Sequence, residues 1–219
     1  MKHLPDRLCW NTVTPLLKTA LTKMMSSGAF QPFRLVGGTS LSLQLGHRTS
    51  VDIDLFTASR YGSIDFSAID TFLRGSFAYV SEPHAGVIGM GTSYLIGDDK
   101  NETVKLDLYY TDIFIQPELV IGAYRLATME EVIAMKIDIV QRGGRKKDFW
   151  DLHELLDRYS PSQMMALHKI RYPFSHKEKT IRSNFTNFTT ADDDFDPICL
   201  KGKYWELIKL DIIQALKKP

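Results

Sequence analysis

The first half of the chain alternates between helix-like and strand-like hydrophobic patterns. Within the first 30 residues, apolar side chains recur at three- and four-residue spacing, which predicts an amphipathic helix that ends at Ser26-Ser27-Gly28. FRLVGG then predicts a short buried strand that runs into a glycine turn, and SLSLQLG predicts one or two helical turns that stop at Gly46. Polar and apolar positions alternate in SVDIDLFT, which predicts a strand.

The pattern changes after about residue 125. Before it, IDFSAIDTFLRG predicts a second amphipathic helix, and FAYVSE, SYLIG and TVKLDLYY predict three strands separated by turns. After it, MEEVIAMKIDIVQRG, KDFWDLHELLDRYS and YWELIKLDIIQALKK predict helices, with polar breaks such as SNFTNFTTADDDFDP between them. We therefore expect an α+β protein with two lobes packed against each other, a mixed α/β core over residues 1–125 and a helical lobe over residues 126–219.

Composition narrows the class of protein without naming its chemistry. With 44% hydrophobic and 24% charged residues, the chain has the make-up of an ordinary globular protein. The 27 Lys and Arg residues nearly balance the 26 Asp and Glu residues, so any surface that attracts nucleic acid must be local. No apolar run approaches the roughly 20 residues that span a bilayer, and no signal peptide is recognisable. Because the two lone cysteines, Cys9 and Cys199, also fit a reducing compartment, we expect a cytoplasmic protein without a membrane partner.

Two aspartates on the predicted strand SVDIDLFT form the first candidate site. Asp52 and Asp54 lie at positions i and i+2, so they share one face and stand about 6.5 to 7 Å apart. Their charges repel each other unless a cation or solvent screens them, and Mg²⁺ commonly binds one or two carboxylates together with substrate phosphates. The pair therefore predicts an open half-site for a divalent metal, completed by a nucleoside triphosphate. The alternative is a solvated strand face.

The Gly-Gly-Thr-Ser sequence ahead of this strand suits a phosphate. Gly37 and Gly38 allow a ligand to approach the backbone closely, and Thr39 and Ser40 can cap the helix that follows. A phosphate at a helix N-terminus meets free N–H groups and a favourable dipole. A phosphate cradle followed by a metal half-site indicates phosphoryl or nucleotidyl transfer, whereas a lone glycine pair would indicate only a turn.

A third carboxylate, Asp107, lies in the predicted strand TVKLDLYY, on the same side as Lys105 and Tyr109. If this strand pairs beside SVDIDLFT, Asp107 joins the two aspartates there. Two metals bridged by three carboxylates would activate an attacking hydroxyl and stabilise the leaving pyrophosphate. The alternative is an ordinary charge on an edge strand.

Charged residues in the helical half form a second candidate cluster. Lys136 emerges from a largely apolar helix, where a lysine can also simply snorkel to the surface. QRGGRKK, residues 141–147, packs four cations into seven residues, which indicates either a solvated loop or a platform for triphosphate or an RNA backbone. Asp148 and Asp151 follow on one side of the next helix, where negative charge also favours the helix dipole. Arg48 would either clamp phosphate or pair with an aspartate.

The two motifs GGTSLSLQLGHRTSVDIDLF and MKIDIVQRGGRKKDFWDL together resemble the AbiEii-type nucleotidyltransferase toxin family, which belongs to the DNA polymerase β-like nucleotidyltransferase superfamily. Their order and spacing over residues 33–156 agree with that family, whereas the last 60 residues carry no such motif. The resemblance implies a polymerase β-like core, which is a mixed sheet with flanking helices, plus a C-terminal helical lobe. It also implies an NTP substrate used with Mg²⁺ or Mn²⁺.

The resemblance implies a nucleotide-binding set. Gly38 and the hydroxyl of Ser40 would correspond to the element that positions the triphosphate. In many superfamily members glycine and serine are adjacent, but Thr39 intervenes here, so either hydroxyl would serve. Arg48 would contact the nucleotide, and Lys136 would face the phosphates.

The resemblance also implies a catalytic and metal-binding set. Asp52 and Asp54 would be metal ligands, and Asp107 would be the third carboxylate and the candidate general base. Asp148 would be the carboxylate of the family's last motif. With Lys136, these residues would carry the chemistry.

The function expected from this resemblance is transfer of NMP from an NTP to an acceptor, with release of pyrophosphate. The acceptor would be RNA, such as tRNA, and the chain would be the toxin of a toxin–antitoxin or phage-defence pair with a cognate antitoxin protein. The near-neutral net charge favours a small-molecule acceptor instead, whereas QRGGRKK favours RNA. A protein hydroxyl is a third acceptor option, and a non-catalytic nucleotide- or partner-binding module is the alternative from a different class.

Overall fold

The computed structural model describes residues 7–84 and 89–217. In this part of the chain, one mixed sheet of seven strands runs in the order β3-β4-β5-β2-β1-β7-β6. β2 is parallel to β5 and antiparallel to β1, and β1 is parallel to β7. β2 therefore lies near the middle of the sheet. The strand bounds are β1 Arg34–Leu35, β2 Asp52–Thr57, β3 Tyr79–Val80, β4 Gly91–Gly97, β5 Thr103–Tyr110, β6 Leu119–Ile121 and β7 Tyr124–Leu126.

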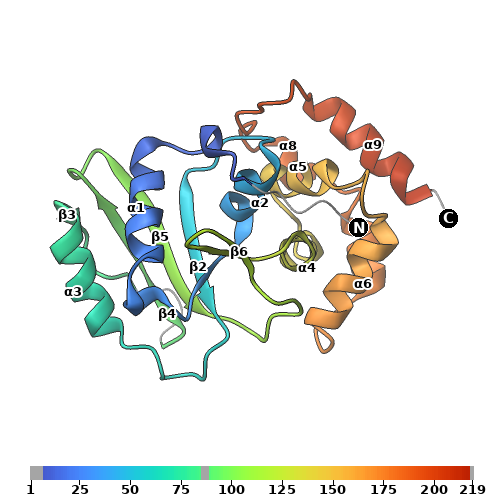
Figure 1. Ribbon diagram of the computed structural model, residues 1–219. Coiled ribbons are helices and arrows are strands. Elements are labelled where there is room, and N and C mark those ends of the chain that lie inside the picture. The colour runs from blue at the N-terminus through green and yellow to red at the C-terminus, as the bar shows by residue number, and fades with distance from the viewer. Residues whose placement is uncertain (1–6, 85–88, 218–219) are drawn as a thin grey trace.

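One hydrophobic cluster joins the sheet to α1 (Pro15–Met25) and α3 (Phe66–Ser76). Ile53 and Leu55 of β2 point into this cluster and are fully buried, so the aspartates that alternate with them face the other side. Figure 1 shows α1 and α3 beside β4 and β5, at the end of the molecule opposite α9. The two short 3₁₀ helices of this region are η1 Trp10–Thr12 and η2 Gly28–Phe30.

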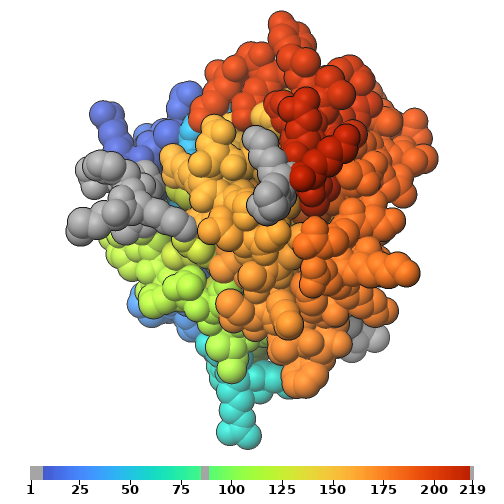
Figure 2. Space-filling model, turned by 90° about the vertical axis from the view of Figure 1, so that its right-hand side faces the viewer, coloured from blue at the N-terminus to red at the C-terminus, as the bar shows by residue number. Residues whose placement is uncertain are grey.

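A second hydrophobic cluster forms the helical lobe and reaches back to the sheet through α2 (Gly37–Leu45). Val36 and Leu41 belong to it, and α2 contacts both α4 and α5. Figure 2 shows this lobe, in orange and red, covering most of one face of the molecule. The helix bounds are α4 Met129–Gln141, α5 Lys146–Glu154, α6 Pro161–Arg171, α7 Glu178–Asn184, α8 Thr189–Asp192 and α9 Trp205–Lys217.

The elements predicted from the sequence are present, and the predicted pairing of TVKLDLYY beside SVDIDLFT is confirmed as β5 beside β2. Three features differ. α8 lies inside SNFTNFTTADDDFDP, which was expected to be a polar break between helices. α2 begins at Gly37 rather than after the Gly-Gly-Thr-Ser turn, so the glycines are its first turn. The β6–β7 hairpin was not predicted, because strands of three residues are too short to show an alternating pattern.

The mixed α/β architecture with a helical C-terminal half agrees with the predicted fold class. The division at residue 125 stays a prediction, because the core of the helical half includes Val36 and Leu41 from the other side of that boundary. No helix in residues 7–84 or 89–217 is both long and apolar enough to cross a membrane.

Candidate active site

A cavity of about 290 Å³ opens where β2 and the first turn of α2 meet the facing sides of α4 and α5. The sheet side contributes two carboxylates, the two glycines and Arg48, and the helical side contributes four cations and Asp138. Phe56, Met135, Ile139 and Tyr172 line an apolar part of the wall. The charged lining residues are Asp52, Asp54, Asp138, Arg48, Lys136, Arg142, Arg145 and Lys147.

Gly37 and Gly38 line the cavity at the start of α2. Gly37 has φ +67°, and a Cβ there would lie 2.6 Å from Oδ2 of Asp54. A Cβ on Gly38 would lie 2.3 Å from Nη2 of Arg48. Only glycine therefore allows both charged groups to approach the helix so closely. No side chain of the described residues caps this helix, so its first N–H groups can meet an anion in the cavity.

The hydroxyls of Thr39 and Ser40 are directed into the protein rather than into the cavity. Thr39 Oγ1 bonds to Ser50 Oγ at 2.7 Å and donates to the carbonyl of Asp52 at 2.5 Å. Ser40 Oγ donates to the carbonyl of Ala127 at 3.2 Å. Both residues are buried, so their visible role is to fix α2 against β2 and the segment before α4. Their predicted contact with triphosphate stays a prediction.

Asp52 and Asp54 both line the cavity from β2, as their alternation requires. Burial, reinforced by the carboxylates of Asp107 and Asp52, raises the pKa of Asp54 to about 6. Across the cavity, Nζ of Lys147 lies 3.9 Å from Oδ2 of Asp52. A divalent cation at this point would stabilise the ionised form of Asp54 against both the burial and the repulsion that raise its pKa.

Asp107 lies opposite Asp54 in the β2–β5 register, but its oxygens have other partners. Oδ1 accepts a hydrogen bond from Ser93 Oγ at 2.6 Å, and Oδ2 accepts one from Lys105 Nζ at 2.6 Å. Asp107 is not part of the cavity wall. Asp107 therefore lies beside the aspartate pair in the sheet, but its carboxylate does not point into the cavity that Asp52 and Asp54 line.

The donor set fits a divalent metal as an open half-site. Among the described residues, no group of three or more His, Cys, Asp or Glu side chains is arranged to hold a metal ion. Asp52 and Asp54 supply two hard oxygen donors next to the N-terminus of α2, a combination that suits Mg²⁺ held partly by substrate oxygens and water. Asp107 would join as a third ligand only after its carboxylate leaves Lys105.

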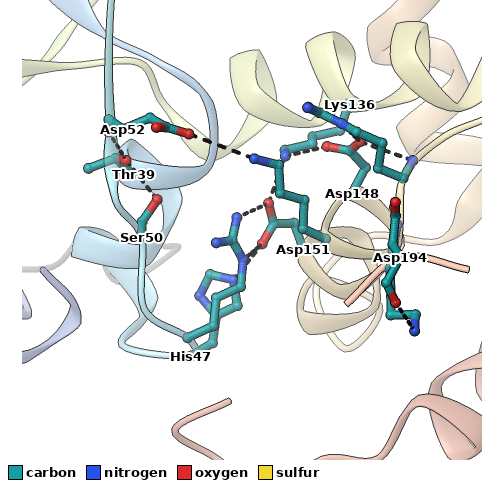
Figure 3. A network of polar contacts seen from close by, with 12 residues as sticks. Thr39, His47, Ser50, Asp52, Lys136, Asp148, Asp151 and Asp194 are labelled. Atoms are coloured by element: carbon teal, nitrogen blue, oxygen red, sulfur yellow. Dashed lines mark hydrogen bonds and ion pairs between the residues drawn. The ribbon is translucent and has the colours of Figure 1, made fainter. Parts of the chain in front are cut away.

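A buried charge cluster faces Asp52 from the helical side (Figure 3). Nζ of Lys136 lies 2.6 Å from Oδ1 of Asp148 and 2.8 Å from Oδ2 of Asp151. Arg48 donates to both oxygens of Asp151, from Nε at 2.6 Å and from Nη2 at 2.8 Å. Nε2 of His47 lies 2.8 Å from Oδ1 of Asp151. Asp151 is thus the shared acceptor that joins the segment after α2 to α4 and α5.

These contacts set the charges of the cluster. Burial opposes the charged form of each group, but Lys136 and Arg48 outweigh it and lower the pKa of Asp151 well below its usual range. In the same way, Lys136 holds the pKa of Asp148 below its usual value. Asp148 and Asp151 in turn raise the pKa of Lys136 despite its burial. Lys136 and Arg48 therefore stay charged at the cavity wall, where two buried carboxylates pair with them.

The basic run QRGGRKK supplies cavity residues that the sequence analysis named only as a run. Arg142, Arg145 and Lys147 line the cavity. Arg142 pairs with Asp138 at 2.6 Å, and Arg145 pairs with Asp148 at 3.2 Å. Burial and the nearby Arg145 lower the pKa of Lys147. An anionic ligand in the cavity would stabilise the charged form of this lysine. The contacts of Asp151 with His47 and Arg48 could not be predicted from the sequence, because spacing carries no signal for a contact across a hundred residues.

Comparison with solved structures defines the class of fold. Over 95% of this chain and 90% of the other, the fold matches JHP933 from Helicobacter pylori with a TM-score of 0.60 at 20% identity. Over 92% of this chain and 82% of the other, it matches the nucleotidyltransferase toxin MenT4 from Mycobacterium tuberculosis with a TM-score of 0.60 at 12% identity. The fold is therefore that of the nucleotidyltransferases.

Residues 19–217 match the family described as nucleotidyl transferase AbiEii toxin, type IV TA system. The chain belongs to this family and is a nucleotidyltransferase. Family membership implies an NTP substrate, typically a divalent metal, and an antitoxin partner. An uncharacterized protein of Aquifex aeolicus is 24% identical over 203 residues, which cover 91% of this chain and 86% of that protein.

Proposed function

We propose that the protein transfers NMP from an NTP, used with Mg²⁺ or Mn²⁺, to an RNA acceptor such as tRNA. It acts in the cytoplasm as the toxin of a toxin–antitoxin or phage-defence pair, and a cognate antitoxin restrains it. One observation carries the reaction type: a helix N-terminus and an aspartate pair face fixed cations across one cavity. That arrangement complements a metal-bound triphosphate at both ends.

The residues have separate roles in binding. The free N–H groups at Gly37 and Gly38 receive a phosphate, and Arg48 and Lys136 supply positive charge along the same wall. Asp52 and Asp54 would hold the metal, which when bound offsets phosphate charge and polarises the reacting phosphorus. Because Asp148 keeps Lys136 protonated, it acts as a positioning residue for that cation.

The chemical step exchanges one phosphorus–oxygen bond for another. The acceptor hydroxyl oxygen bonds to the α-phosphorus, and the bond between that phosphorus and the α–β bridging oxygen breaks. Pyrophosphate leaves, and the hydroxyl proton passes to a carboxylate. Asp107 is the proposed base, because it adjoins Asp54 in the register and becomes available once Ser93 or Lys105 releases one of its oxygens.

RNA is the proposed acceptor because the cavity rim carries partly exposed cations. Arg142, Arg145 and Lys147 have side-chain exposures of 69%, 54% and 40%. Cations in such positions can neutralise backbone phosphates as well as the triphosphate. This local basic rim can attract RNA although the net charge of the whole chain is near zero.

The test is transfer of label from each of four α-³²P NTPs, with Mg²⁺, to RNA, protein and small-molecule fractions. Asp52→Asn is expected to lower transfer at least about 100-fold by removing a metal ligand. Asp157→Asn is the matched control, because Asp157 is exposed in the turn after α5 and lies outside the cavity. Label in RNA that Asp52→Asn loses and Asp157→Asn keeps is the expected result. Label confined to protein or small molecules would replace the acceptor, and no label from a folded protein that binds Mg-NTP would favour a binding module.

A further inference from the structure

Phe195 presents its whole ring to solvent beside the active-site rim. Its exposed fraction is 99%. It belongs to the polar segment between α8 and α9, which no part of the mechanism above uses. Such a ring can offer a fixed binding surface only where its loop is held in place.

Lys146, the first residue of α5, binds the loop on both sides of Phe195. Its N–H donates to Oδ2 of Asp194 at 2.9 Å, and its Nζ donates to the carbonyl of Asp194 at 2.5 Å. The same Nζ lies 2.9 Å from Oδ1 of Asp196. Lys146 is itself buried, with a side-chain exposure of 6%. Both neighbours of Phe195 are therefore fixed to α5, and the ring projects from a fixed base.

The loop and the active site share two cations. A hollow of about 290 Å³ is lined by Arg145, Lys147, Asp194, Phe195 and Pro197. Arg145 and Lys147 also line the catalytic cavity, and Lys147 lies 3.9 Å from Asp52. A path of surface residues thus leads from the metal half-site over two cations to an exposed aromatic ring.

Two partly exposed cations in the hollow can contact an anionic occupant. The two aspartates beside Phe195 are bound to Lys146, and Asp192 is bound to Lys209 and to the indole of Trp205. Lys146 and Lys209 therefore offset part of the negative charge of this segment, in which Asp193 is also exposed, whereas Arg145 and Lys147 keep exposed guanidinium and ammonium groups in the hollow. Cations that follow a phosphate backbone next to an aromatic stacking surface are the arrangement by which proteins bind single-stranded nucleic acid.

We propose that Phe195 stacks on an unpaired base of the acceptor RNA while Arg145 and Lys147 contact its phosphates. This inference rests on the proposed function, and it deepens it by naming where the acceptor strand enters. The strand passes over the hollow, and its terminal hydroxyl reaches the cavity at Asp52 and Asp54. The acceptor is therefore a single-stranded RNA end rather than a duplex.

The test compares Phe195→Ala with Phe195→Trp in two assays. The first measures the affinity for a fluorescein-labelled single-stranded RNA of roughly ten nucleotides, and the second measures the KM for RNA in transfer. Loss of one stacked base is expected to weaken RNA binding and raise KM about 5- to 150-fold. Phe195→Trp should restore both values, and Mg-NTP binding should be the same in all three proteins.

Phe174→Ala is the matched control. Phe174 is equally exposed, at 103%, but the hollow that it lines contains neither Arg145 nor Lys147. It should leave RNA affinity unchanged. Equal effects of the two alanine variants, or no effect of Phe195→Ala, would overturn this inference while leaving RNA transfer intact. Selective loss of RNA binding in Phe195→Ala, with no RNA labelled by the wild type, would uphold the binding site and refute the proposed reaction. Unchanged RNA affinity with lost antitoxin neutralisation would make this surface a protein site and overturn the inference.

Discussion

At the scale of single residues, Asp54 lies in an environment that suits a metal ligand but lowers the stability of the folded protein. It lies against the glycine at the start of α2 and near two other carboxylates. In the absence of a cation, its ionised form is therefore less stable in the folded protein than in the unfolded chain. We therefore expect Asp54 to contribute to ligand binding while lowering the free energy of unfolding.

Asp54→Asn is expected to stabilise the metal-free protein at alkaline pH. The pKa is raised from 3.8 to about 6, so ionisation penalises the folded state as pH rises through this window. The gain should approach an upper limit of about 3 kcal/mol near pH 8 and shrink as pH falls toward about 4. Urea unfolding in chelator across this range measures it, with Asp157→Asn as the surface control. Equal destabilisation of Asp54→Asn at every pH would contradict the argument.

At the scale of elements, α4 contributes one residue to the cavity and another to a buried ion pair that holds the two lobes together. Lys136 lies on the cavity, and Glu131 lies in a buried ion pair with Arg171 of α6. Glu131 Oε2 also accepts the N–H of Ile115 at 2.8 Å, and Arg171 donates to the carbonyl of Ile113 at 3.2 Å. The pair thus ties the segment after β5 to two helices of the other lobe.

Arg171→Met is expected to lower the free energy of unfolding by about 3 kcal/mol, because it leaves Glu131 buried without its cation. Arg182→Met is the control, since Arg182 pairs with Glu178 on the surface of α7 and is 47% exposed. Its loss should cost at most about 0.5 kcal/mol. Urea unfolding of both variants measures the difference. Similar small losses for the two would mean that the buried pair contributes little more than a surface pair.

Helix α5 shows how consecutive residues serve different neighbours. Lys146 binds the loop that carries Phe195, Lys147 faces the cavity, and Asp148 pairs with Lys136. Successive residues on a helix point in directions about 100° apart, so one helical turn reaches all three. The N-terminus of α5 therefore connects the acceptor path to the nucleotide site.

At the scale of the whole molecule, Asp151 is the point where three segments meet. It accepts from Arg48 after α2, from Lys136 on α4, and from His47. Because its pKa lies well below the usual range, its contribution to stability is fully present above about pH 4 and is lost only as pH falls through the depressed value.

Asp151→Asn is expected to destabilise the protein at neutral pH by about 3–5 kcal/mol, since two buried cations lose their shared carboxylate. The difference from wild type should narrow in strong acid, where wild-type Asp151 is also protonated. Thermal melts from neutral to acidic pH measure this. Asp211→Asn is the control, because that surface carboxylate pairs only with His153 and is 55% exposed. If the stability difference between wild type and Asp151→Asn did not change with pH, the charge of Asp151 would not be the source of its contribution.

The local pattern of the sequence was enough to predict most elements and part of the site. Alternation placed Asp52 and Asp54 on one strand face, and the glycines before them indicated a turn at a helix start, whose phosphate binding stays a prediction. These features depend on neighbours in sequence, so the chain itself determines them. Asp107 was correctly expected beside them in the sheet. Its bonds to Ser93 and Lys105 depend on side-chain packing, which strand pairing alone does not specify.

Only the tertiary structure decided which charges meet. Arg48 could pair with an aspartate or clamp phosphate, and folding brings it to Asp151, some hundred residues away in sequence. The ring of Phe195 gained its place at the active-site rim because Lys146 binds the carbonyl of Asp194 and the carboxylate of Asp196, on either side of it. Hydrophobic periodicity records what one element buries, but it carries no term for contacts between distant elements, and this site is built from such contacts.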